Sequence, residues 1–162
     1  MHVHEFIFKS IQGASMSLSR WTGQPILIVN TASESQYAPQ LYKLQELHQE
    51  YSPSGLVVIG IPCNEFGEKE PLDGEDLDKH YWETHRVNFP VTEKHQIIGP
   101  HPHPLFMTMR EEYTFEMLPQ GNFYKYLFSR DGDILEHWPS DVAPDDSGLR
   151  HQIERNASSW CL

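Results

Sequence analysis

Residues 25–62 read "PILIVNTASESQYAPQLYKLQELHQEYSPSGLVVIGIP", and this stretch decides the fold. Two apolar runs, at 25–30 and 55–62, have no polar face, which is typical of central strands in a parallel sheet. Between them, aromatic, aliphatic and histidine side chains recur at helical spacing: Tyr37, Leu41, Leu44, His48 and Tyr51. The stretch therefore predicts a strand–helix–strand unit.

The rest of the chain supplies further elements on both sides of this unit. Residues 4–23 predict a strand pair with turns near Gly13 and Gly23. The later elements are a helix over 75–88, a short helix over 104–111, a hairpin around "RDGD" at 130–133 and a closing helix over 145–158. This order predicts an α/β fold of the thioredoxin-like kind, with an N-terminal β-hairpin and a central mixed β-sheet flanked by helices on both faces.

Length and charge narrow the class of protein. A chain of 162 residues fits one domain, spanning 1–162. Its formal net charge of -11 argues against nucleic acid and anionic membranes as partners. The first residues lack a signal-peptide pattern, and no apolar run is long enough to cross a bilayer. Cys63 and Cys161 lie far apart and suit a reducing compartment, so we expect a cytoplasmic protein.

Five segments, in order, carry a likeness to a known family. They are "LIVNTAS" at 27–33, "GLVVIGIPCNEFGEKEP" at 55–71, "NFP" at 88–90, "HPLF" at 103–106 and "NFYKYLFSRDGDI" at 122–134. Together the set resembles the glutathione peroxidase family and spans nearly the whole chain. The resemblance implies reduction of hydroperoxides by a thiol reductant, glutathione or thioredoxin, without a bound cofactor.

The resemblance also assigns the catalytic positions, and three of them depart from the family pattern. Ser35 stands at the position of the nucleophilic cysteine or selenocysteine, Lys69 at the glutamine position and Gly121 at the tryptophan position. Only Asn122 matches. The segment at 80–90, which carries a resolving cysteine in many thioredoxin-dependent members, has no cysteine.

Position 35 is expected to favour a thiolate. Reactive groups lie beyond the carboxyl ends of parallel strands, and a helix starting there offers N–H groups and a partial positive charge. Both lower the pKa of a thiol. A serine hydroxyl is far less acidic and lacks the sulfur that carries oxygen through the redox cycle. We therefore expect the chain as written to be inactive toward peroxide.

Several interpretations of Ser35 remain open. It is either a substitution of a natural cysteine or the mark of a natural pseudoenzyme, a non-catalytic binding module on the same fold. A serine nucleophile of a hydrolase is a third interpretation, although the chain has no G-x-S-x-G motif. Ser35 as a helix cap is compatible with the first two.

Three other positions have alternative roles. Lys69 either points into the site, where it takes over the glutamine's role, or is a solvated lysine between Glu68 and Glu70 in an exposed loop. Gly121 should leave the pocket wider. Cys63 is either a redox thiol that pairs with residue 35 or a buried structural cysteine.

An aromatic side chain from another part of the chain could fill the space at Gly121; the candidates are Tyr124, Trp82 and Trp138. Cys161 is expected to be an exposed, mobile thiol.

Two His-x-His pairs raise the question of a metal site. His2 with His4, and His101 with His103, would each point to one side of an extended segment and could chelate a transition metal. No cysteine or acidic ligand joins them at a motif spacing. We therefore expect no resident metal.

Overall fold

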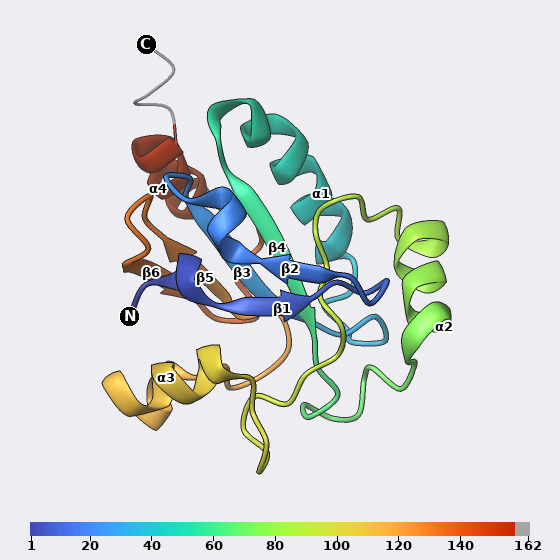
Figure 1. Ribbon diagram of the computed structural model, residues 1–162. Helices are drawn as coiled ribbons and strands as arrows, with labels where there is room; N and C mark the ends of the chain where they lie inside the picture. The colour runs from blue at the N-terminus through green and yellow to red at the C-terminus, as the bar shows by residue number, and fades with distance from the viewer. Residues whose placement is uncertain (158–162) are drawn as a thin grey trace.

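A four-stranded sheet in the order β4-β3-β5-β6 organises the protein (Figure 1). The computed structural model describes residues 1–157. β3 (Ile26–Thr31) and β4 (Val57–Pro62) pair in parallel and are buried along their whole length. β5 (Lys125–Phe128) runs antiparallel to β3, and β6 (Ile134–Trp138) runs antiparallel to β5. The predicted mixed sheet and its hairpin at 130–133 are confirmed.

Helices cover both faces of this sheet, as predicted (Figure 1). α1 (Gln40–Tyr51), α2 (Gly74–Lys79) and α4 (Ser147–Ala157) pack on one face. α3 (Pro104–Glu112) packs on the other. The sheet is therefore the middle layer of three.

The predicted N-terminal hairpin joins α3 on its face of the sheet. It pairs β1 (Ile7–Lys9) with β2 (Ser15–Ser17), and its Phe8 and Met16 side chains are buried with those of α3. Gly13 turns the chain between the two strands with φ 90°. Short 3-10 segments complete the fold: Val3–Glu5, Leu18–Trp21, Ser52–Ser54 and Phe115–Met117.

Side-chain alternation along the central strand explains the two cores. Leu27 and Val29 point into the core with α1 and α4, whereas Ile26 and Ile28 point into the core with the hairpin and α3. A strand with apolar residues at every position can satisfy both faces, which is why the unbroken apolar run predicted a central position.

Two helices differ in detail from the prediction. α1 begins at Gln40 rather than near Tyr37, because residues 33–39 form a series of turns before it. The predicted helix at 75–88 is α2 followed by a π-helical turn, His80–Thr84. Leu77 and Tyr81 are buried from this segment, whereas His85, at the same helical spacing, is only half-buried.

Two further expectations concern membrane-spanning segments and Cys161. Within residues 1–157, no helix is both long and apolar enough to cross a membrane. Cys161 lies outside the described residues, so its exposure stays a prediction.

His103 connects the hairpin to α3. Its Nδ1 accepts a hydrogen bond from the Leu105 N–H (3.0 Å) and so caps α3, which requires the proton to be on Nε2. Nε2 then donates to the Ile7 carbonyl (2.8 Å), and the ring stacks on Phe8. Burial lowers the pKa of His103 to about 4, because the protonated ring would lose its cap and its solvation.

This geometry predicts loss of stability in acid. A histidine whose pKa is lowered by folding destabilises the protein as pH falls below its ordinary value of 6.5, and the loss is complete below about 4. The contribution of His103 should be roughly 3 kcal/mol. Urea unfolding at pH 7 and pH 4 measures it.

The comparison needs two variants. His103→Asn keeps a capping acceptor without a titrating group and should lose less stability between pH 7 and pH 4 than the wild type. His101→Gln, on an exposed neighbour, should lose as much as the wild type. Equal acid losses in all three proteins would contradict the assignment to His103.

Candidate active site

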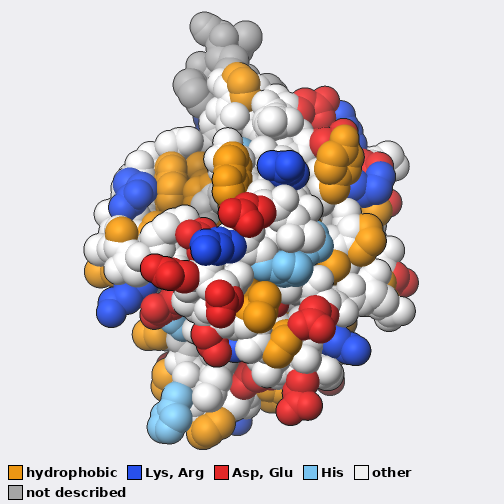
Figure 2. Space-filling model, turned by 90° about the vertical axis from the view of Figure 1, so that its right-hand side faces the viewer, with side chains coloured by type: hydrophobic (Ala, Val, Ile, Leu, Met, Phe, Trp, Pro, Cys, Tyr) orange, Lys and Arg blue, Asp and Glu red, His pale blue; other side chains and the backbone are white. Residues whose placement is uncertain are grey.

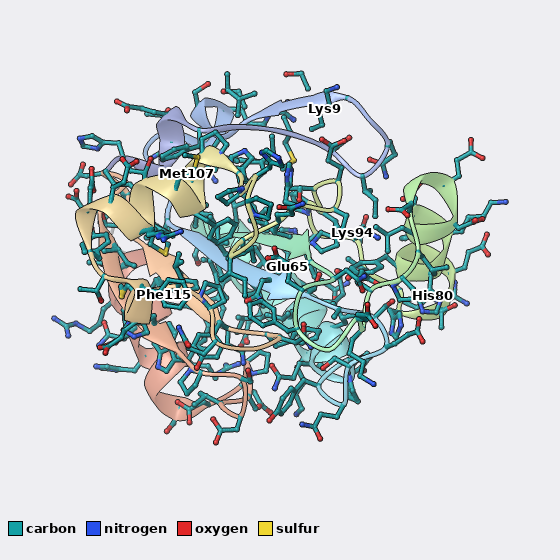
Figure 3. The ribbon with its side chains drawn as sticks, turned by 90° about the horizontal axis from the view of Figure 1, so that it is seen from below. Lys9, Glu65, His80, Lys94, Met107 and Phe115 are labelled. Atoms are coloured by element: carbon teal, nitrogen blue, oxygen red, sulfur yellow. The ribbon has the colours of Figure 1, made fainter. Side chains whose placement is uncertain are left out.

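One open pocket of about 640 Å³ brings together the four predicted site positions, Ser35, Lys69, Gly121 and Asn122. It lies beyond the carboxyl end of β3, the side seen in Figure 3. The other lining residues are Gln36, Tyr37, Phe66, Gln120 and Ser140. The three segments that line it around residues 35, 69 and 121 are distant in sequence and meet only through the fold.

Ser35 is held in a tight turn. Its N–H donates to the Ala32 carbonyl (3.1 Å), and its Oγ accepts from the Tyr37 N–H (3.0 Å). This is a local side-chain turn two residues long, and the residue at the N-cap of α1 is Pro39. The expectation that Ser35 caps the helix is therefore wrong: it closes a turn five residues before α1.

The surroundings of Ser35 lack the partners of a serine nucleophile. The side chain is only 7% exposed. Among the described residues, no histidine lines this pocket, so no general base stands beside the hydroxyl. The geometry gives the hydrolase interpretation no support.

Asn30, at the end of β3, holds the loop that carries residues 121–124. Its Nδ2 donates to the Gly121 carbonyl (2.9 Å), and its Oδ1 accepts from the Tyr124 N–H (3.0 Å). Its own carbonyl accepts from the Phe123 N–H (2.7 Å). Phe123 has φ 63°, an unfavourable backbone conformation that these bonds help to fix. Sequence reasoning read Asn30 only as part of a family segment.

Asn122 is turned into the site by this loop. Its Nδ2 donates to the Phe66 carbonyl (3.0 Å), which links the loop to the 64–70 segment. Its Oδ1 is buried and has no hydrogen-bond partner within residues 1–157. An unpaired buried acceptor costs stability, so it is available to a donor group in this region.

The space that a side chain at residue 121 would enter is taken by a polar group rather than by an aromatic ring. A Cβ added at Gly121 would lie 3.1 Å from the Ser140 Oγ. None of Tyr124, Trp82 and Trp138 lines the pocket. The segment after β6 therefore forms this wall, and the aromatic side chains that do line the pocket are Tyr37 and Phe66.

The buried Lys125 and the half-buried Gln40 hold Ser140 in place. Lys125 donates to the carbonyls of Pro139 and Ser140 (3.3 Å each), and Gln40 donates to the Ser140 carbonyl (2.8 Å). Lys125 is fully buried, and burial lowers the pKa of its ammonium to about 7. The sequence did not indicate this burial, because a lysine is normally exposed even among apolar neighbours.

Lys69 combines features of both interpretations. Its side chain is exposed, yet it lines the pocket, and its carbonyl accepts from the Glu34 N–H (2.9 Å) beside Ser35. Its surroundings differ from the predicted exposed loop, because Glu70 is fully buried.

The buried Glu70 carboxyl lies behind the Ser35 turn. It accepts hydrogen bonds from the Ser33 N–H (3.1 Å), the Ser33 hydroxyl and the Tyr81 hydroxyl, and Thr31 bonds Tyr81 in turn (2.7 Å). Burial raises the pKa of Glu70, partly offset by these donors. The network ties β3, the 64–70 segment and the helix that follows into one unit. The sequence signal for it was only the position of Glu70 within the family-like "EKEP".

Cys63 is placed apart from this pocket. It is fully buried in the core with the hairpin and α3, and its thiol donates to the Glu65 carboxyl (3.5 Å). Glu65, near the centre of Figure 3, also accepts the N–H groups of residues 97–99. Burial raises the pKa of the Cys63 thiol to about 12, which suppresses the thiolate needed for redox chemistry.

The His-x-His pairs are occupied by other contacts. His2 and His4 each bond a backbone carbonyl, of Asp131 and Gln24 respectively. Both ring nitrogens of His103 are used, while His101 is exposed. Within residues 1–157, no group of three or more histidine, cysteine or acidic side chains is placed to hold a metal ion.

Comparison with known proteins identifies the family. The family model described as "Glutathione peroxidase" matches residues 3–110. The chain belongs to the glutathione peroxidase family. The glutathione peroxidase homolog BsaA of Staphylococcus epidermidis is 32% identical over 155 residues, which cover 94% of this chain and 97% of that protein. Probable glutathione peroxidase 8 of Homo sapiens is 32% identical over 156 residues, covering 93% of this chain and 74% of that protein.

Solved structures agree with this glutathione peroxidase fold. The crystal structure of Trgpx in apo form superimposes with a TM-score of 0.75 at 26% identity, covering 98% of this chain and 97% of that one. A thiol-disulfide isomerase from Corynebacterium glutamicum gives a TM-score of 0.72 at 15% identity, covering 98% and 97%. The second likeness concerns the fold alone. The fold of this chain is thioredoxin-like, as predicted.

The contact at Gly121 gives a stability prediction. Gly121→Ala should destabilise the protein by about 1 kcal/mol, because the new methyl group would lie 3.1 Å from the Ser140 Oγ, which must then shift by a few tenths of an ångström. Ser140→Ala alone should be nearly neutral, and the double variant should recover most of the loss. Chemical denaturation of the four proteins measures the coupling. Additive effects would show that the two residues do not meet in the folded protein.

Proposed function

We propose that the chain as written is an inactive member of the peroxidase family, and that its scaffold reduces hydroperoxides when residue 35 is cysteine or selenocysteine. The observation that carries the proposal is the position of Ser35 in one pocket with Asn122 and Lys69. The pocket holds the nucleophile position beside a buried amide and a cationic side chain. It has no thiol among its described lining residues.

The chemistry requires sulfur or selenium at position 35. A thiolate there attacks the peroxide O–O bond, takes the distal oxygen to become a sulfenic acid and releases an alcohol or water after protonation. One external thiol then condenses with the sulfenic acid, releasing water and forming a mixed disulfide. A second thiol restores the cysteine and leaves as a disulfide. A serine oxygen cannot follow this cycle.

Asn122 is positioned to assist such a cycle. Its side chain lines the pocket near position 35, so its amide could hydrogen-bond the reacting group or the peroxide. Lys69 would lower the pKa of a thiol at position 35 if its ammonium lies near it. The pocket is open and has a volume of about 640 Å³, which leaves room for a bulky hydroperoxide.

The reductant we favour is a protein of the thioredoxin kind. Glutathione is anionic, and the chain has a net charge of -11, which disfavours their encounter. Cys63, the one cysteine among residues 1–157, is too deeply buried to act as a resolving thiol in this conformation. We therefore propose that an external thiol completes the cycle.

The direct test is Ser35→Cys in a Cys161→Ser background. Hydroperoxide consumption should rise at least about tenfold above the Ser35 protein with thioredoxin and thioredoxin reductase, because a thiol is partly ionised near neutral pH and a serine hydroxyl is not. Hydrogen peroxide and cumene hydroperoxide are compared, and glutathione with its reductase serves as the second reductant.

Asn122→Ala in the Ser35→Cys protein tests the role of the site amide, and Gln49→Ala is its matched control. It should lower the rate with unchanged folding, whereas Gln49→Ala, on the exposed face of α1, should not. Absence of turnover with both reductants, in a folded protein with a titratable thiol at position 35, would overturn the proposal. The codon for residue 35 in the natural gene is a separate check.

The second candidate function is a non-catalytic binding module. It rests on the unpartnered Asn122 Oδ1 beside an open pocket, which leaves a buried acceptor for a ligand's donor group. Calorimetry of the Ser35 protein with oxidised glutathione and with tert-butanol, a hydroperoxide product, distinguishes the candidates. Saturable binding that Asn122→Ala abolishes favours the module.

A further inference from the structure

A groove separates the turn of the N-terminal hairpin from α2 and its π-helical turn. It consists of two adjoining hollows of about 490 and 400 Å³, which share Ile11, Gln12 and Asp78. We call it the hairpin–α2 groove. Of its lining residues only Tyr81 belongs to the network behind Ser35, and none lines the Ser35 pocket, so it is a separate surface.

One half of the groove is apolar. Its hydrophobic side chains are Ile11, Met16, Trp82, Val87, Phe89 and Val91. Polar and charged side chains, among them Asp78 and Lys79, also line it. Trp82 is 53% exposed, an unusual degree for the largest apolar side chain. An exposed indole beside a hollow lined by aliphatic groups offers an apolar or cationic side chain a ready contact.

The other half is acidic. Asp73, Glu75, Asp78 and Glu93 line it with a single cation, Lys94. Lys94 pairs with Asp73 (2.9 Å) and donates to two backbone carbonyls, so its charge is already engaged. Figure 2, which faces the α2 side of the molecule, shows acidic side chains with hydrophobic side chains between them.

We propose that the hairpin–α2 groove binds an extended segment of a partner protein in which basic residues adjoin apolar ones. The occupant is argued from charge complementarity. Beyond the Asp73–Lys94 pair, three carboxylates against one cation, Lys79, attract the basic side chains, and the apolar half with Trp82 takes their hydrophobic neighbours.

The groove also contacts the network behind Ser35. Tyr81 lines the apolar half, and its hydroxyl donates to Glu70, which accepts from Ser33. A bound segment would therefore touch a residue that is two hydrogen bonds from the turn of position 35. Binding at the groove does not depend on whether position 35 is catalytic.

The test uses a defined probe. The acetylated, amidated hexapeptide Leu-Lys-Phe-Arg-Leu-Lys is titrated into the ¹⁵N-labelled wild-type protein, with Leu-Glu-Phe-Glu-Leu-Glu and Ser-Lys-Ser-Arg-Ser-Lys as controls. We expect saturable binding of the first peptide only, with the largest amide shifts at Ile11, Asp78 and Trp82. Absence of saturable binding, or shifts centred elsewhere, overturns the proposal.

Matched variants separate the groove from the general acidity of the protein. Glu75→Gln with Asp78→Asn should weaken binding at least about tenfold, because two attractive charges are lost while the new amide oxygen at position 78 can still accept from Gln12. Trp82→Ala should weaken it about fivefold. Glu111→Gln with Glu116→Gln removes two exposed charges around α3 and should have no such effect. Equal weakening by both acid pairs overturns the groove as the binding site.

Discussion

The hydrogen bonds to the buried carboxyl of Glu70 are the interaction on which the arrangement of the site depends. One carboxyl accepts from the backbone and hydroxyl of Ser33 and from the hydroxyl of Tyr81, and it is fully shielded from solvent. A buried carboxyl is tolerated only when such donors satisfy it. Because its donors come from the end of β3 and from the segment after α2, satisfying Glu70 fixes the turn that carries Ser35.

That turn explains why location and chemistry disagree at position 35. The fold places the residue in the pocket with Asn122 and Lys69, yet the serine oxygen is used as an acceptor for the Tyr37 N–H. The start of α1 lies five residues further on, so the local turn rather than the first turn of the helix surrounds the side chain. The pocket survives the change of residue because its walls are held by other groups. Asn30 holds one wall, and Lys125 with Gln40 holds the other.

Much of the fold could be predicted from the sequence because burial on both faces leaves a strong pattern. The apolar runs of β3 and β4 indicated two strands buried along their whole length, but only β3 is central, because β4 ends the four-stranded sheet. The four site positions also came from the sequence, through the family likeness. Glu70 and Lys125 were missed, because a charged residue is normally exposed and its burial depends on partners distant in the chain.

The sequence by itself determined the layered α/β fold, the family and the residue at position 35, because strand and helix periodicities and ordered motifs are local properties of the chain. Only the tertiary structure decided the rest. It buried Glu70, and it put Ser140 where a side chain at residue 121 would begin. It also placed Cys63 in the core with the hairpin and α3, apart from the Ser35 pocket. It also opened a groove between the hairpin and α2. The physical reason is that desolvation and hydrogen bonding depend on which distant segments meet, and no local pattern specifies that.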